Sequence, residues 1–413
     1  MRNTALSTME QTADSGVDAV GGRRLTAGVL ALLAGLAAIG TLSTTIILPS
    51  FSSIGASLGV NARDLGLTLS SFFMAFAVGQ LVVGPLSDRF GRRLPVLGGL
   101  AVFLIGSAVC ASADSMTVLI LGRVVQALGV CAASVLSRAI ARDLFDGEAL
   151  ARVLALTMVA MAAAPGFSPL LGGALDALFG WRAAFVLVGV MAALLAAFYA
   201  LGTGETHPPD RRSAWTPSAV GSAYGRLLTD RRFILPALSV SLVIGGLYAF
   251  FGAAPAILMT ALGFSPLQLG LFFAATVFVV FGAGLLAPRL AHRWTAPRVA
   301  TAGILLCLAG GVILLGGGGT ADLTLFTVAI AVFLFGMGLV NPLGTAIALH
   351  PFGRQAGLAS ALLGFLQMVC AAAGAALATA LPQPPVGALA ITMAGAAALS
   401  LLAFLGLRAS PAR

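Results

Sequence analysis

Twelve apolar segments follow one another along the chain, each close to the length of a membrane span. An α-helix needs about 20 apolar residues to cross the hydrocarbon core of a bilayer, and short polar stretches separate runs of this length here. The predicted spans lie near 25–47, 65–86, 94–112, 117–138, 152–174, 182–202, 233–258, 267–288, 298–317, 323–348, 356–380 and 386–407. The pattern therefore predicts an all-α polytopic membrane protein with twelve transmembrane helices.

The longest polar stretch between spans divides the predicted helices into two groups of six. It covers 203–231 and contains GTGETHPPDRRSAWTP, which is typical of a linker. The loop GPLSDRFGRR after the second span has a weaker counterpart, APRLAHRW, after the eighth. We therefore expect two pseudo-symmetric six-helix bundles, 25–202 and 232–407, with a cytoplasmic linker at 203–231, a disordered cytoplasmic tail at 1–24 and a short cytoplasmic tail at 408–413.

Composition excludes a soluble protein. Of the 413 residues, 59% are hydrophobic and only 9% are charged, whereas soluble domains carry about 25% charged residues. All 23 basic residues are arginines, and they form short clusters between apolar runs rather than the solvated patch of a nucleic-acid-binding protein. With the N-terminus inside, only Arg63, Arg123 and Arg182 lie outside the cytoplasmic segments. The positive-inside rule therefore predicts that both termini are cytoplasmic.

The loop after the second span concentrates charge between two glycines. Gly84 permits close helix approach and Gly91 a tight turn, while Asp88 can pair with a loop arginine or with a helix N-terminus. A charged hinge that breaks and re-forms is suited to gating. An alternative is that the three loop arginines only anchor the topology. The candidate gating residues are Gly84, Asp88, Arg89, Gly91, Arg92 and Arg93.

This loop resembles the signature GxxxDRxGRR of the major facilitator superfamily and agrees with it at every defined position. LGRVVQALG in span four and APGFSPLLGGAL in span five are similar to the superfamily's arginine-bearing and antiporter motifs. More narrowly, the chain resembles the Bcr/CflA branch of multidrug and chloramphenicol-type exporters through RAIARDLF, WRAAF, YAFFGAAP and AGLASALLGFLQM. The resemblance implies a drug/proton antiporter that works by alternating access in the bacterial inner membrane, with conformational control by Asp88 and Arg89.

Arg123 lies inside span four, and Gln126 falls three residues on, on the same helical face. Because an intramembrane arginine is energetically expensive, we expect both residues to take part in transport or coupling. The alternative is that Arg123 extends its long side chain to the outer interface.

Span five contains two prolines and three glycines that favour a kinked, tightly packed helix. The prolines remove backbone donors and the glycines permit close contact, so packing is the role that the residues themselves indicate. The resemblance implies that this packing also prevents leak. The residues are Pro165, Gly166, Pro169, Gly172 and Gly173.

A drug site should be a mostly apolar cavity with few polar groups. Aromatic residues share one face of span two and one face of span seven, although such stripes also serve ordinary helix packing. The candidate lining residues are Thr45, Phe72, Phe76, Tyr248, Phe251, Asn341 and Gln367.

Thr45 marks a departure from the related exporters, which carry an acidic residue just before the LP dipeptide of span one. No acidic residue of this chain falls in the middle of a span. Proton coupling would therefore use an acid near an interface, such as Asp64, or a proton carried by the substrate. Asp64 can equally serve only to cap its helix. A uniporter, or a metabolite exporter without proton coupling, is the alternative function.

Other classes of function have little support in the sequence. The four cysteines and three histidines form no metal-binding or catalytic pattern, and a chain without lysine cannot contain a P-loop. We expect no enzyme activity, no cofactor, no metal and no nucleic-acid partner. The expected partners are a small-molecule substrate, protons if transport is coupled, and the lipid bilayer, around a monomer. A receptor or membrane enzyme that transports nothing is the weaker alternative.

Overall fold

The computed structural model describes residues 26–212 and 216–409, which are helical and contain no strand. Twelve helices in these ranges are long and apolar enough to cross a membrane, which confirms the predicted fold class. The first six are α2 (Ala27–Thr45) with η1 (Leu48–Ser50) and α3 (Phe51–Leu58), α4 (Ala62–Phe90), α5 (Arg93–Ala111), α6 (Met116–Leu144), α7 (Gly147–Phe179) and α8 (Arg182–Gly202). The last six are α10 (Arg231–Ala254) with η3 (Pro255–Ala261), α11 (Pro266–Trp294), α12 (Ala296–Gly316), α13 (Leu323–Leu349) with η4 (His350–Gln355), α14 (Ala356–Ala380) and α15 (Pro385–Ala409). The tail expected at 1–24 lies outside the described residues.

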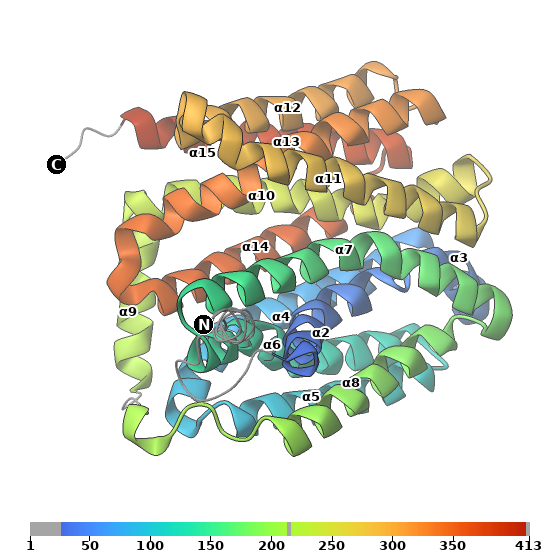
Figure 1. The fold of residues 1–413 in the computed structure, drawn as a ribbon. Coiled ribbons are helices and arrows are strands. Elements are labelled where there is room, and N and C mark those ends of the chain that lie inside the picture. The colour runs from blue at the N-terminus through green and yellow to red at the C-terminus, as the bar shows by residue number, and fades with distance from the viewer. Residues whose placement is uncertain (1–25, 213–215, 410–413) are drawn as a thin grey trace, which may run out of the picture.

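The six-helix halves lie one above the other in Figure 1, with their helices running between two common ends. We call the end at which α2 begins and α15 finishes the termini end, and the other the far end. The halves meet chiefly through two helix pairs, α4 with α14 and α7 with α11. α7 and α11 lie side by side toward the far end and diverge toward the termini end (Figure 1).

Several helices extend beyond the predicted spans. α4 and α6 have 29 residues each and α7 has 33, because hydropathy detects only the apolar part of a helix that continues through polar end turns. Side-chain caps fix where α4 and α6 begin: Asn61 caps α4, and the Ser115 hydroxyl accepts the N–H of Val118 at the start of α6. α2 ends at Thr45, close to the predicted end of span one at residue 47, but η1 and α3 continue the span beyond it. After a turn at residues 46–47, Pro49 lies in the first turn of η1, where its missing N–H costs no helical bond, and α3 then runs to Leu58.

The predicted linker contains helical structure of its own, η2 (Pro209–Arg211) and α9 (Pro217–Thr229). α9 crosses the termini end and packs against α10 and α14 (Figure 1). Its first turn contains Pro217, a residue favoured at that position, and the helix buries Ala223 and Leu227. The polar sequence around it predicted only a linker.

Each half contains a seam where two helices touch through glycines. A Cβ added at Gly99 of α5 would lie 2.5 Å from the carbonyl oxygen of Gly129 on α6. The second half repeats this arrangement, since a Cβ at Gly303 of α12 would lie 2.8 Å from the carbonyl oxygen of Gly336 on α13. Backbone thus packs against backbone within each half, at equivalent helices of the repeat.

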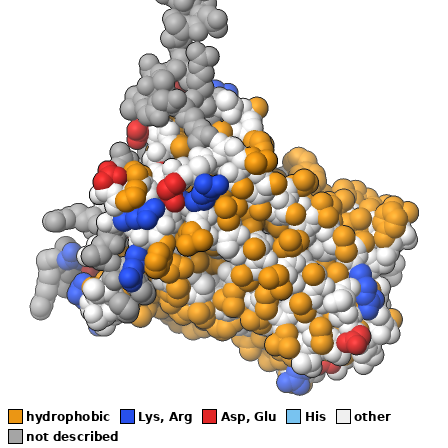
Figure 2. Space-filling view, turned by 90° about the horizontal axis from the view of Figure 1, so that it is seen from below, with side chains coloured by type: hydrophobic (Ala, Val, Ile, Leu, Met, Phe, Trp, Pro, Cys, Tyr) orange, Lys and Arg blue, Asp and Glu red, His pale blue; other side chains and the backbone are white. Residues whose placement is uncertain are grey.

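The outer surface suits a bilayer. Figure 2 shows hydrophobic side chains over the middle of the visible face, with charged side chains gathered toward its ends. Leu178, Phe278 and Leu402 are among the exposed residues, with 73%, 71% and 66% of their surface accessible. So much apolar exposure is stable only where lipid replaces water.

Candidate functional site

Arg123 is fully buried inside the first half, on α6. Its Nη1 donates to the backbone oxygen of Ser43 on α2 at 3.0 Å and to Oε1 of Gln126 at 2.9 Å. Its guanidinium carbon lies 4.3 Å from the ring centroid of Phe72 on α4. Because these contacts come from three helices and leave no accessible surface, the alternative that Arg123 reaches a membrane interface is wrong.

The hydrogen-bond capacity of Arg123 is only partly used. Its Nε and Nη2 atoms are buried and have no hydrogen-bond partner among the described residues, and no carboxylate there forms an ion pair with it. Gln126 extends the cluster, donating from Nε2 to the Ser107 hydroxyl on α5 at 2.8 Å. A buried cation without an ion-pair partner is energetically costly. The N–H groups of Arg123 Nε and Nη2 remain available to a polar or anionic group.

Thr45 is fully buried at the end of α2. Its hydroxyl lies 2.6 Å from the Ser168 hydroxyl of α7 and donates to the backbone oxygen of Thr41 at 3.0 Å. At the position where the resemblance implied an acid, this chain therefore joins two helices through a pair of hydroxyls. Neither hydroxyl releases a proton near neutral pH.

Two aspartates lie near the far end. Asp64 takes part in a capping box at the start of α4: its N–H donates to Asn61 Oδ1 at 3.1 Å, and its Oδ2 accepts the N–H of Asn61 at 3.3 Å. Asp176, near the end of α7, accepts the Ser53 hydroxyl with both carboxylate oxygens at 2.8 Å. Neither aspartate forms an ion pair with an arginine of the described ranges.

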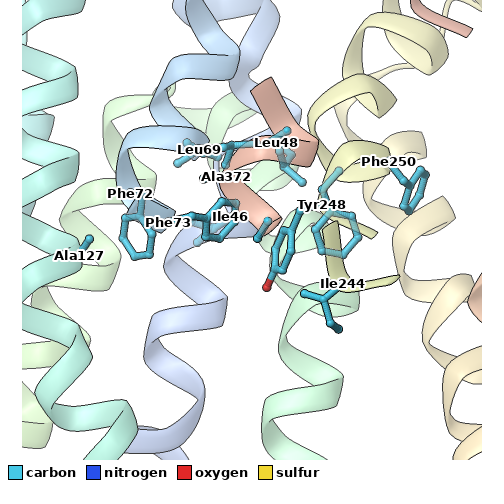
Figure 3. Packing of buried hydrophobic residues seen from close by; sticks show 14 of the residues in the cluster. Ile46, Leu48, Leu69, Phe72, Phe73, Ala127, Ile244, Tyr248, Phe250 and Ala372 are labelled. Atoms are coloured by element: carbon cyan, nitrogen blue, oxygen red, sulfur yellow. The ribbon is translucent and has the colours of Figure 1, made fainter. Parts of the chain in front are cut away.

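The aromatic residues of α4 and α10 meet where the two halves touch, as Figure 3 shows. The ring centroids of Phe73 and Tyr248 are 4.3 Å apart, and Tyr248 lies 5.4 Å from Phe251. Phe72 instead packs beneath Arg123 and stacks on Phe76 at 6.2 Å. Phe73 is therefore the inter-half residue that the sequence analysis missed, because the register of a uniformly apolar helix does not reveal which face meets a partner.

The two remaining polar candidates for the cavity lie on the second half. Asn341 is exposed on α13 and Gln367 is half-buried on α14. Gln80 of α4 is almost completely buried, and its side chain occupies the space over Gly364 of α14. These residues place amide groups on helices of both halves.

The glycines of α7 contact both halves. A Cβ at Gly166 would overlap with the Val277 side chain of α11, and a Cβ at Gly172 with the Ile46 carbonyl oxygen that follows α2. At Gly173 it would lie 2.7 Å from the carbonyl oxygen of Pro266, the first residue of α11. Close packing was predicted for this motif, and the far-end contact with the other half depends on it. Pro165 and Pro169 lie inside the same continuous helix.

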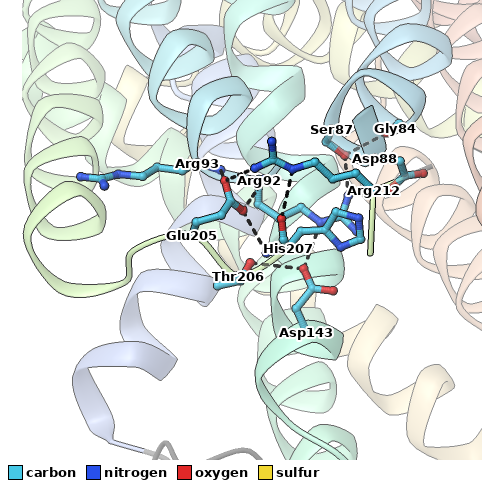
Figure 4. Close-up of polar contacts among 10 residues, drawn as sticks. All are labelled: Gly84, Ser87, Asp88, Arg92, Arg93, Asp143, Glu205, Thr206, His207 and Arg212. Carbon is cyan, nitrogen blue, oxygen red and sulfur yellow. Dashed lines mark hydrogen bonds and ion pairs between the residues drawn. The ribbon is translucent and has the colours of Figure 1, made fainter. Parts of the chain in front are cut away.

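The charged loop between α4 and α5 is held at the termini end by Arg92 (Figure 4). Nη1 of Arg92 donates to Asp88 Oδ1 at 2.6 Å and to the Ser87 hydroxyl at 2.6 Å, and its Nε donates to Asp143 Oδ2 of α6 at 3.0 Å. Burial lowers the pKa of Arg92, but the hydrogen bonds to Asp88 and Asp143 outweigh it and raise that pKa. The predicted partners of Asp88 were a loop arginine or a helix N-terminus, and in the structure Asp88 forms an ion pair with the loop arginine Arg92.

The other loop residues have different surroundings. Gly91 turns the chain with a φ of 87°, as a tight turn requires. The expectation for Gly84 is wrong, because a Cβ there would meet no atom within 4 Å and no close helix approach occurs. Arg89 lies over the Phe90 ring at 5.2 Å, and Arg93 donates to the Ala200 backbone oxygen at 3.2 Å.

Glu205, in the polar stretch after α8, is a further member of this cluster (Figure 4). Its two carboxylate oxygens accept the N–H groups of Arg92 and Arg93 at 2.8 and 3.2 Å, so it caps α5. Burial raises the pKa of Glu205, but backbone donors, including His207, and the charge of Arg212 outweigh it and leave that pKa lowered. Sequence analysis missed Glu205 because its partners lie more than 100 residues away.

A family model described as Major Facilitator Superfamily matches residues 33–375. The chain belongs to the major facilitator superfamily. It is 30% identical to Multidrug resistance protein D of Escherichia coli (strain K12), over 93% of this chain and 97% of the relative. It is also 27% identical to the Bicyclomycin resistance protein homolog of Haemophilus influenzae, over 92% and 94% of the two chains. Among solved structures, an inward-facing bacterial homolog of the human lysosomal transporter Spinster has a TM-score of 0.73 at 18% identity, covering 93% of this chain and 98% of that one.

As a major facilitator protein with relatives of this kind, the chain is a multi-pass bacterial membrane transporter. The resemblance to Bcr-type exporters that the motifs predicted is confirmed. The three superfamily motifs correspond to three distinct places in the fold: the Arg92 cluster at the termini end, the buried Arg123 cluster, and the α7 contact at the far end.

Proposed function

We propose that this protein is a secondary active transporter that exports small amphiphilic drugs or metabolites across the bacterial inner membrane in exchange for protons. Both termini lie in the cytoplasm, so the termini end faces inward. The transporter acts as a monomer. The names of the relatives, which refer to multidrug and bicyclomycin resistance, support this substrate class.

The observation that carries alternating access is the unequal contact between the halves. At the far end α7 and α11 touch at Gly173 and Pro266, whereas toward the termini end these two helices diverge (Figure 1). Packing of this kind can separate and re-form as two rigid bodies rock. The described arrangement then corresponds to the state closed on the outside.

The substrate is proposed to bind between the halves, where aromatic and amide side chains from both are near one another. Tyr248, Phe251 and Phe73 supply apolar and aromatic surface, and Asn341 and Gln367 supply hydrogen-bonding groups. Phe72 and Phe76 support Arg123 from α4, and Thr45 joins α2 to α7. In this proposal a polar group of the substrate, or a water next to it, uses the unpaired donors of Arg123.

Proton coupling requires a group that gains and loses a proton during the cycle. Thr45 cannot do so, and Asp64 is the acid that the sequence favours, although its capping box already gives it a structural role. Asp176 is a second candidate, because its carboxylate forms no ion pair among the described residues and lies about one turn from Gly173, where the halves meet. A proton carried by the substrate is the remaining route.

Purified protein in proteoliposomes tests the proposal. Bicyclomycin and chloramphenicol, for which relatives are named, are the first probes, and efflux is recorded together with internal pH. Substrate flux that drives opposite proton movement supports antiport. If flux occurs without proton movement, the protein is a uniporter or uses another ion, and if no compound in a wider panel moves, the transport proposal is wrong. Asp64→Asn and Asp176→Asn, at matched protein levels, then identify the proton carrier. If one variant keeps substrate flux but loses proton movement, the aspartate that it replaces carries the proton.

A further inference from the structure

The carbonyl group of Leu81 has lost its helical partner. In an α-helix the oxygen of residue 81 accepts the N–H of residue 85, but residue 85 of α4 is proline, which has no N–H. A backbone oxygen left unpaired inside a protein is destabilising unless another donor reaches it.

Tyr224 of the linker helix α9 is that donor. Its hydroxyl donates to the Leu81 oxygen at 3.1 Å across a sequence separation of 143 residues. Burial raises the pKa of Tyr224 to about 12, so the hydroxyl keeps its proton at every physiological pH. The hydrogen bond thus depends only on the relative position of α9 and α4.

That position depends on the two halves. α9 is fixed to the second half, where its buried Leu227 packs in one cluster with Phe233 of α10 and Leu362 of α14. Leu81 belongs to the first half and lies against the same cluster. The Tyr224 hydrogen bond therefore crosses between the halves at the termini end, about two turns before Asp88 on α4.

We propose that Tyr224 is a positioning residue, whose hydrogen bond to the Leu81 oxygen holds the linker helix against α4 and stabilises the far-end-closed arrangement. The proposal rests on the proposed function, since only a transporter with two arrangements has an equilibrium to shift. When the halves rock, α4 moves relative to the helices that hold α9, and the hydrogen bond breaks. Pro85 leaves the Leu81 carbonyl oxygen free to accept the Tyr224 hydroxyl, so the interaction requires both the proline and the tyrosine.

The test is a cycle of Tyr224→Phe and Pro85→Ala, which respectively remove the donor and give Leu81 a helical N–H. Spin labels at exposed Leu178 of α7 and Leu271 of α11, in a background free of the four native cysteines, report far-end separation in lipid nanodiscs. Loss of one neutral hydrogen bond should change the ratio of closed to open populations by about twofold to tenfold toward open. In the Pro85→Ala background Tyr224→Phe should have no further effect.

Tyr199→Phe is the matched control, because the Tyr199 hydroxyl has no hydrogen-bond partner among the described residues. Adding a transported compound to the parent protein establishes separately whether two populations exist. If the parent shows both but Tyr224→Phe leaves their ratio unchanged, the positioning role is wrong while the transport proposal stands. An equal effect of Tyr224→Phe with and without Pro85 also overturns it, because the hydroxyl would then act elsewhere. A parent that neither changes separation nor transports refutes the proposed function itself.

Discussion

Replacing Gly173 by alanine should open the far end of the protein. The added Cβ would lie 2.7 Å from the oxygen of Pro266, 2.9 Å from its carbonyl carbon and 3.3 Å from the nitrogen of Leu267. All three atoms are backbone at the start of α11, so no side chain can rotate away. The overlap is relieved only if α7 and α11 separate.

The size of the effect follows from that overlap. Inserting one methyl group into a tightly packed contact costs about 1–3 kcal/mol. Because the overlap exists only while the far end is closed, this strain acts on one of the two arrangements. A difference of about 1–3 kcal/mol shifts an equilibrium by about 5-fold to 150-fold.

Distance measurements between spin labels test this prediction. The Leu178 and Leu271 pair should lengthen, while a pair at Leu156 and Leu285, on the termini-end parts of α7 and α11, should shorten as that end closes. Gly282→Ala on α11 is the control, because its Cβ would meet no atom within 4 Å. If Gly173→Ala gives the same two distributions as Gly282→Ala, the far-end contact does not set the equilibrium.

Three other variants test the remaining site residues. Arg123→Lys keeps the positive charge but cannot donate to both Ser43 and Gln126 in the same geometry. Transport in proteoliposomes should fall at least about tenfold while membrane insertion stays normal. A wild-type transport rate would show that Arg123 is structural. Asp88→Asn removes one anionic partner of Arg92 and should change cysteine labelling from both sides of the membrane, so unchanged labelling would contradict a gating role. Glu205 has a lowered pKa, so its stabilisation of α5 is full above its ordinary pKa and is lost as pH falls through the lowered value. Thermal unfolding of Glu205→Gln should therefore lose part of this acid dependence, and a pH profile identical to that of the parent would refute the capping role.

The sequence predicts the helices well because each span carries its own apolar length. It also places Arg123 and Gln126 on one face, since their spacing lies within a single helix. Contacts between distant segments cannot be predicted in this way. Glu205 caps α5 and Tyr224 reaches Leu81 through loop and linker conformations that no local period encodes. The sequence analysis chose Phe72 for the cavity and missed Phe73, which makes the contact between the halves. Phe72 and Phe73 are adjacent and equally apolar, so hydropathy does not show which of them faces the other half.

The paired glycine seams have a mechanical consequence. Where Gly99 meets Gly129 and Gly303 meets Gly336, no side chains lie between the backbones that could slide or change rotamer, so neither half has a soft layer at these positions. A helix of 29 residues is about 44 Å long. In the proposed rocking cycle each half would therefore move as a rigid body, and a displacement of less than about 1 Å at Gly173 would be transmitted to the opposite membrane surface as a rotation.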